Sequence, residues 1–132
     1  MEIGVVYPQI ELGGRPADAQ RFALAAEALG FDHLVAYDHV LGAVHEAREP
    51  ALLGPYTELD PFHDPFMLFS YLAGQTTRLK FFSGIIILPQ RQTALVARQA
   101  AYLHRVPGGR FRRGPRSGWD YVEHESPGAG LP

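Results

Sequence analysis

The sequence predicts an α/β protein built on a parallel sheet. Three observations lead to this prediction: short β-branched segments alternate with segments of helical periodicity, each connection is long enough for a parallel crossover, and glycine or proline separates the elements. The composition fits one globular domain, because 46% of the 132 residues are hydrophobic and 20% are charged. Cysteine is absent, which excludes disulfides, thiolate metal ligands and a cysteine nucleophile.

The charge and hydropathy of the chain exclude some classes of binding partner. A net charge of −2 argues against a general binder of polyanions. No apolar run approaches the roughly 20 residues that a membrane-spanning helix needs. The first residues do not form a basic and then apolar leader. We therefore expect a cytoplasmic protein without a membrane partner.

The first strand–helix–strand unit is predicted from three segments. Residues 2–7 form a β-branched run that a proline closes, which predicts a buried strand. Residues 17–29 carry apolar side chains at helical spacing, with a proline before them and a glycine after them as start and stop signals. Residues 33–37 predict a second strand that ends just before an Asp-His pair.

The second unit follows a long connection at residues 40–64, and a connection of this length is usually functional or disordered. Residues 66–76 are apolar enough for a short buried helix. Residues 79–88 form the most strongly predicted strand of the chain, and a proline closes it. The next helix is expected at residues 94–104, with Thr93 as its cap.

The last part of the chain differs in composition, so we divide the chain into a domain at 1–110 and a poorly ordered tail at 111–132. Residues 111–116 stand where the alternation calls for a fourth strand. Two adjacent arginines and a proline argue against a strand that is buried on both faces.

Five segments carry a further pattern in a fixed order: IGVVYP at 3–8, AAEALGFDH at 25–33, AYDHVLG at 36–42, DPFHDPF at 60–66 and ILPQRQTALVA at 87–97. Together they resemble the N-terminal half of luciferase-like monooxygenases, most closely the branch of coenzyme F420-dependent oxidoreductases. The resemblance implies a partial (β/α)8 barrel with about four parallel strands and crossover helices, because a complete barrel needs about 250 residues. It also implies an oxidoreductase that is truncated and weak or inactive alone.

The resemblance implies that Asp38 and His39 are the catalytic residues, that both contact coenzyme F420, or alternatively FMN, and that His39 is an acid/base group. Hydride would pass between this ring and a small organic substrate. In a parallel barrel both residues would lie at the C-terminal ends of strands, where active sites are found. A carboxylate beside an imidazole can bind a ligand or exchange a proton with it. The residues alone favour a plainer interpretation, with Asp38 as a helix cap or loop hydrogen-bond acceptor and His39 as a solvated side chain; the resemblance reverses this preference.

The end of the third strand is the second implied cofactor contact. Ile85, Ile86 and Ile87 would form an apolar ledge for the ring, and the plain alternative is a buried strand. The family uses the end of the fourth strand as well, but the arginines and proline within residues 111–119 put that site in doubt.

Three other interpretations stay open. Glu58, Asp60, His63 and Asp64 could bind a divalent cation, although acidic loops are usually only solvated, and we expect no metal. The basic stretch Arg105–Arg116 has the chemistry of a phosphate or nucleic-acid site, which we consider a weaker alternative. A partial barrel also exposes strand edges, which favours a non-catalytic, self-associating module or a homo-oligomer.

Overall fold

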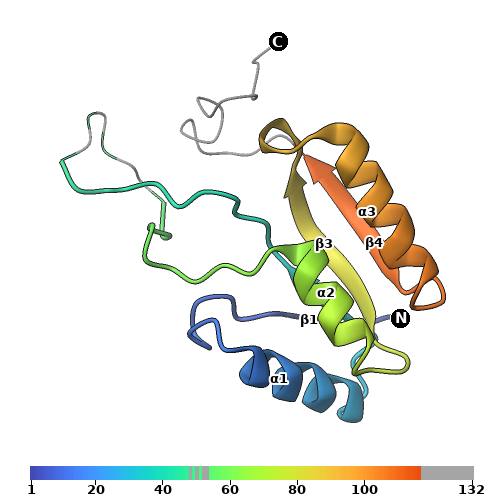
Figure 1. Cartoon of the computed structure of the whole chain (residues 1–132). Coiled ribbons are helices and arrows are strands. Elements are labelled where there is room, and N and C mark those ends of the chain that lie inside the picture. The colour runs from blue at the N-terminus through green and yellow to red at the C-terminus, as the bar shows by residue number, and fades with distance from the viewer. Residues whose placement is uncertain (48, 50, 52–53, 117–132) are drawn as a thin grey trace.

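The computed structural model describes residues 1–47, 49, 51 and 54–116, with the backbone alone for residues 113–116. Its elements, in chain order, are β1 (Gly4–Val6), α1 (Pro16–Ala28), β2 (His33–Ala36), α2 (Pro65–Ala73), β3 (Lys80–Ile87), the 3₁₀ helix η1 (Leu88–Gln90), α3 (Thr93–Arg105) and β4 (Phe111–Arg116). The strands form one parallel sheet in the order β1-β2-β3-β4 (Figure 1). The predicted α/β class, with four parallel strands and crossover helices, is confirmed.

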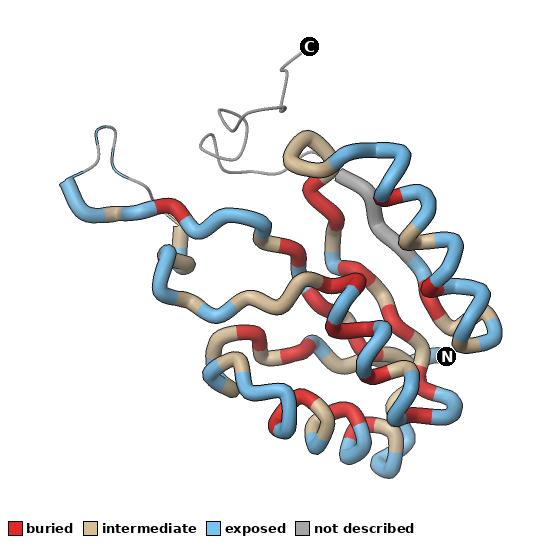
Figure 2. Tube along the Cα trace, viewed as in Figure 1, coloured by how far each residue is buried: buried red, intermediate tan, exposed pale blue. Residues whose placement is uncertain are grey.

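The helices share one hydrophobic core with a single face of the sheet (Figure 2). Strands β2, β3 and β4 and all three helices contribute apolar side chains to this core. Its members include Ala19, Ala23, Leu34, Ala36, Phe66, Phe69, Leu72, Phe81, Ile86, Val96, Leu103 and Phe111. The opposite face carries half-buried side chains, among them Val35 and a His33–Phe82 ring pair with centroids 4.8 Å apart. The sheet therefore has one buried face and one half-buried face. Because its strands are parallel, their C-terminal ends all lie on the same side of the sheet.

The helix boundaries follow from local capping. Asp64 caps α2, because its Oδ1 accepts a hydrogen bond from the Met67 amide at 3.0 Å. At the start of α3, the Leu95 amide donates to Gln92 Oε1 at 2.6 Å, so the predicted cap at Thr93 is wrong and Thr93 is the first helical residue. Within the described ranges, no helix has the length and apolar character to cross a bilayer.

The first strand differs from the buried strand that its composition predicts. Only Gly4–Val6 pair with β2, and the side chains of Ile3 and Val6 are 52% and 47% exposed. The reason is position: β1 is an edge strand of the described sheet, so one side and part of one face stay uncovered.

Residues 111–116 form the fourth strand, and their arginines and proline argue only against a strand that is buried on both faces. Phe111 is buried, and its ring lies 5.9 Å from the rings of both Phe66 and Phe69, whereas Arg112 is exposed. Within the described residues β4 pairs only with β3, and an edge strand tolerates proline and charge. The expectation of a poorly ordered tail otherwise concerns residues 117–132, which lie outside the described residues.

A β-bulge interrupts β3 near its C-terminal end. Ser83 pairs with position 113 and Ile86 with position 115, so β3 has one residue more than β4 over this stretch. The extra residue shifts the alternation of side chains, and bulges commonly re-aim side chains at barrel rims and active sites. Ile86 consequently enters the core, while Ile85 and Ile87 face the other way.

Candidate functional site

A pocket of about 280 Å³ lies at the C-terminal ends of β2 and β3. Its lining comes from the segment after β2, from the long connection and from the bulge, and consists of Tyr37, Asp38, His39, Tyr56, Phe62, Gly84, Ile85 and Ile87. The structure thus brings the Asp-His pair together with two of the three isoleucines. Ile86 does not line this pocket, because the bulge directs it into the core, where it is fully buried.

Asp38 is occupied by contacts within the chain. Its side chain is 1% exposed, and its carboxylate accepts two hydrogen bonds from Arg91, at 2.8 Å from Nε and 2.6 Å from Nη2. The Ile87 amide donates a third hydrogen bond to Asp38 Oδ2 at 3.0 Å. These contacts tie the end of β2 to the end of β3, and they match the simpler interpretation of Asp38 as a hydrogen-bond acceptor.

Arg91 is the residue that sequence reasoning missed. Besides Asp38, its guanidinium binds Asp64 Oδ2 at 2.8 Å and lies 5.7 Å from the centre of the Phe66 ring. Burial opposes the charge, but the two carboxylates raise the pKa of Arg91 above its ordinary value. The partners lie 53 and 27 residues away in sequence, so no local pattern marks this group.

Aromatic side chains form one wall of the pocket. The rings of His39 and Phe62 have centroids 4.9 Å apart, those of Tyr56 and Phe62 are 4.8 Å apart, and His39 and Tyr56 are 6.0 Å apart. Burial, assisted by nearby Tyr37, raises the pKa of Tyr56, so its hydroxyl stays protonated near neutral pH. We refer to His39, Tyr56 and Phe62 as the aromatic wall.

A second hollow of about 240 Å³ adjoins the pocket at the end of β1 and shares Tyr37 and Tyr56 with it. Gln9 lines this hollow, and its Nε2 donates to the Tyr37 carbonyl at 2.7 Å. Its Oε1 accepts from the His63 amide at 3.3 Å. Hollow space therefore continues along the C-terminal ends of three strands, with two tyrosines between its parts.

Two of the acidic side chains of the long connection, Asp60 and Asp64, have structural partners. Asp60 Oδ2 accepts from the amide and the hydroxyl of Thr57, at 2.6 and 3.1 Å, and Asp64 caps α2 and binds Arg91. His63 packs its ring 5.9 Å from that of Tyr7. In the part of the chain that the structure describes, no three His, Asp or Glu side chains gather as a metal site would require.

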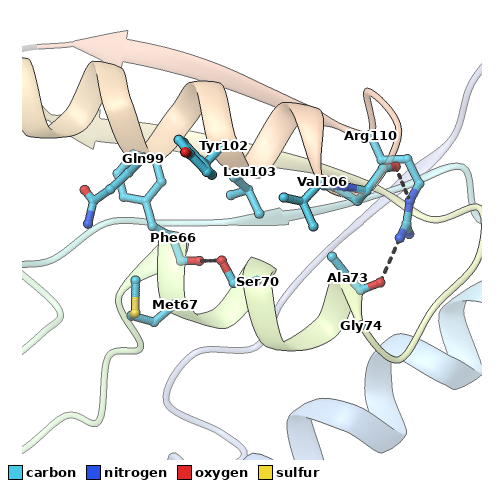
Figure 3. A pocket seen from close by; sticks show the side chains of 11 residues that line it. Phe66, Met67, Ser70, Ala73, Gly74, Gln99, Tyr102, Leu103, Val106 and Arg110 are labelled. Atoms are coloured by element: carbon cyan, nitrogen blue, oxygen red, sulfur yellow. Dashed lines mark hydrogen bonds between the residues drawn. The ribbon is translucent and has the colours of Figure 1, made fainter.

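A larger groove, of about 480 Å³, lies between α2 and α3 on the helical layer, away from the strand ends (Figure 3). Its lining is mainly apolar, and the Ser70 hydroxyl donates to the Phe66 carbonyl at 2.7 Å. Arg110, at one end, donates five hydrogen bonds to the chain around it, four of them to backbone carbonyls. Arg110 is therefore not available as a phosphate ligand, and the side chains of Arg113 and Arg116 lie outside the described residues.

Solved structures of several proteins share this fold. The oxygenating constituent of 3,6-diketocamphane monooxygenase from Pseudomonas putida, solved with FMN, is 22% identical with a TM-score of 0.72, covering 95% of this chain and 32% of its own. DmoA from Hyphomicrobium sulfonivorans is 17% identical with a TM-score of 0.73, covering 95% and 30%. Coenzyme F420-dependent tetrahydromethanopterin reductase from Methanopyrus kandleri is 18% identical with a TM-score of 0.62, covering 95% and 28%.

The chain thus spans about a third of the length of each of these proteins. A search of curated proteins finds no match to the sequence. The sequence profile of the luciferase-like monooxygenases matches residues 1–132. Because this profile matches residues 1–132 of a chain with a parallel sheet and a pocket at its strand ends, the chain belongs to the luciferase-like monooxygenase family.

Proposed function

We propose that this chain forms the ring-binding pocket of an oxidoreductase that uses coenzyme F420 or FMN and transfers hydride to or from a small organic substrate. The observation that carries the proposal is the pocket at the ends of β2 and β3, which joins the Asp-His pair to an apolar ledge in a chain of this family. Neighbours in structure include an FMN complex and an F420-dependent enzyme, so they support a flavin or deazaflavin without choosing between them.

The residues present fit the ring portion of such a cofactor. Ile85 and Ile87 offer an apolar surface, and Gly84 beside them lets the Tyr37 ring pack directly against the strand. The aromatic wall stands across the pocket and favours a planar ligand through stacking. Lysine and arginine are absent from the described lining, so these residues would hold the ring and not a phosphate-bearing tail.

In this proposal His39 is the catalytic residue and Asp38 is a positioning residue. The bound ring supplies the hydride chemistry. The His39 imidazole, which lines the pocket, holds or accepts the proton that accompanies oxidation or reduction of the substrate. The carboxylate of Asp38 is turned to Arg91 and the Ile87 amide, so it fixes the backbone before His39 and does not itself exchange protons with a ligand.

Titration with FMN and with coenzyme F420, followed by fluorescence, tests this proposal. We expect saturable binding of at least one ligand, and loss of that binding in Ile85→Glu, which places a charge on the ledge. Leu59→Glu is the matched control, because Leu59 is 84% exposed and does not line the pocket. The proposal fails if neither ligand saturates, or if Ile85→Glu binds as tightly as the unchanged protein while its circular dichroism is native.

Self-association is a second candidate, favoured by the two edges of the sheet. Within the described residues, β1 and β4 each pair on one side only, and unpaired edges promote strand addition. A second copy of the chain is the expected partner. Sedimentation at micromolar concentration tests this idea, and a single monomeric species would remove it.

A further inference from the structure

We infer that Arg91 is a positioning residue for the strand-end pocket: it holds together the two ends of the connection that carries the aromatic wall. Nothing in the family resemblance assigns it this task; the inference comes from its contacts. It rests on the proposed function only for the ligand-binding measurement below.

The first contact secures the start of the connection. Asp38 follows β2 directly, and Arg91 grips its carboxylate with two parallel hydrogen bonds, from Nε at 2.8 Å and from Nη2 at 2.6 Å. Both side chains are shielded, at 1% and 14% exposure. A two-point contact of this kind fixes orientation as well as distance.

The second contact secures the end of the connection. Asp64 Oδ2 accepts from Arg91 Nη2 at 2.8 Å, while Asp64 Oδ1 accepts from the Met67 amide at the start of α2. The guanidinium also lies 5.7 Å from the centre of the Phe66 ring, in the first turn of α2. One side chain, placed just after β3, therefore joins the end of β2 to the beginning of α2.

This arrangement determines where the aromatic wall stands. His39 is next to Asp38, and Phe62 is two residues before Asp64, so the 4.9 Å ring contact between His39 and Phe62 spans the two ends that Arg91 joins. Gln9 also bridges the two ends, through the Tyr37 carbonyl and the His63 amide, but it contacts backbone groups only. Without the Arg91 contacts the ends of this long connection therefore keep one link and gain freedom. The wall would then move away from Ile85 and Ile87.

The chemistry requires arginine at this position. Lysine would keep the positive charge, but it offers a single ammonium group on a flexible stem in place of a planar fork. It can neutralise the carboxylates without fixing both orientations and without stacking on the Phe66 ring. Arg91→Lys therefore keeps the positive charge and removes the two-point hydrogen-bond geometry, so it separates the effects of the two.

The test compares Arg91→Lys with Arg98→Lys. Arg98 is a matched control, because it lies on the outer side of α3 and contacts the exposed ring of Tyr102 at 4.9 Å. Amide hydrogen exchange is measured without ligand over residues 54–62. We expect Arg91→Lys to speed exchange there by about tenfold, with β3 unchanged, and Arg98→Lys to have no effect. The inference is overturned if the two variants exchange alike.

A second variant keeps the test decisive if Arg91→Lys does not fold. Asp64→Asn preserves the helix cap and the Asp38 contact but removes one charge from the cluster. It should speed exchange over residues 54–62 by about threefold, and unchanged exchange would contradict the inference.

Ligand binding separates this inference from the proposed function. FMN and coenzyme F420 serve as probes, and Arg91→Lys should weaken the binding of whichever probe binds by about tenfold. Failure of the unchanged protein to bind either probe sinks the proposed function, while the exchange result still decides the role of Arg91. Unweakened binding in Arg91→Lys, with unchanged exchange, rejects the inference alone.

Discussion

Replacement of Arg110 by methionine should cost the fold several kcal/mol, which would identify this arginine as structural. Its Nε donates to the Pro107 carbonyl at 3.0 Å, and Nη1 donates to Thr76 Oγ1 and to the Leu79 carbonyl, both at 3.0 Å. Nη2 donates to the carbonyls of Ala73 and Thr76 at 2.8 and 3.1 Å. The guanidinium thus joins the end of α2 to the segments before β3 and β4.

The magnitude follows from these contacts. A hydrogen bond to a charged group contributes about 1.5–3 kcal/mol, and five bonds from one side chain are not additive. Water reaches part of this half-buried site in the variant, so we count roughly two bonds at about 1.5–2.5 kcal/mol each, or about 3–5 kcal/mol in total. Such a loss is a large fraction of the 5–15 kcal/mol typical of a domain, and at about 4 °C per kcal/mol it lowers Tm by about 12–20 °C.

Thermal and urea unfolding, followed by circular dichroism, measures this cost. Arg105→Met is the matched control: Arg105 belongs to the same basic stretch but is exposed in the last turn of α3, where it contributes at most about 1 kcal/mol through the helix dipole. If Arg110→Met and Arg105→Met lose equal and small free energies of unfolding, the structural assignment is wrong.

Three further changes test other parts of the structure. A Cβ on Gly84 would lie 2.4 Å from Tyr37 Cδ1, so Gly84→Ala should displace that ring and weaken binding of FMN or coenzyme F420 in titrations, at a cost of about 1–3 kcal/mol in unfolding free energy. Partial burial opposes ionisation of Glu27, but hydrogen bonds from the amides of residues 77 and 78 and the Thr77 hydroxyl lower its pKa. Ionised Glu27 therefore stabilises the fold above pH 4.5, and this stabilisation is lost as the pH falls through the lower folded pKa. In Glu27→Gln, the free energy of unfolding in urea should therefore depend less on pH in this acidic range. Burial lowers the pKa of His63, so the unfolded chain binds the proton first and stability declines as the pH falls below about 6.5; His63→Phe should remove that decline, and an unchanged pH profile would count against it.

The order and type of most elements were predictable because they depend on local patterns. Alternating apolar runs and terminal prolines indicated β2, β3 and the three helices to within a few residues. Edge effects were not predictable in this way. Whether residues 111–116 tolerate arginine and proline depends on how many neighbours the strand has, and that is decided by topology and not by the segment itself.

The candidate site was predictable only in part. Parallel topology requires the ends of neighbouring strands to meet, which places Asp38 and His39 beside Ile85. The structural role of Asp38 could not be predicted from the sequence, because its partner Arg91 lies 53 residues further along the chain. The opposite orientation of Ile86 was hidden for another reason: a uniform run of isoleucines contains no signal for an inserted residue.

The bulge in β3 also has a consequence for how this pocket can change. Because Ser83 and Ile86 pair with positions only two apart in β4, deletion of Gly84 would restore a regular ladder with Ile86 still in the core, and would take one residue out of the pocket lining. Length variation at one point in a strand can therefore remodel a binding surface without any substitution in it.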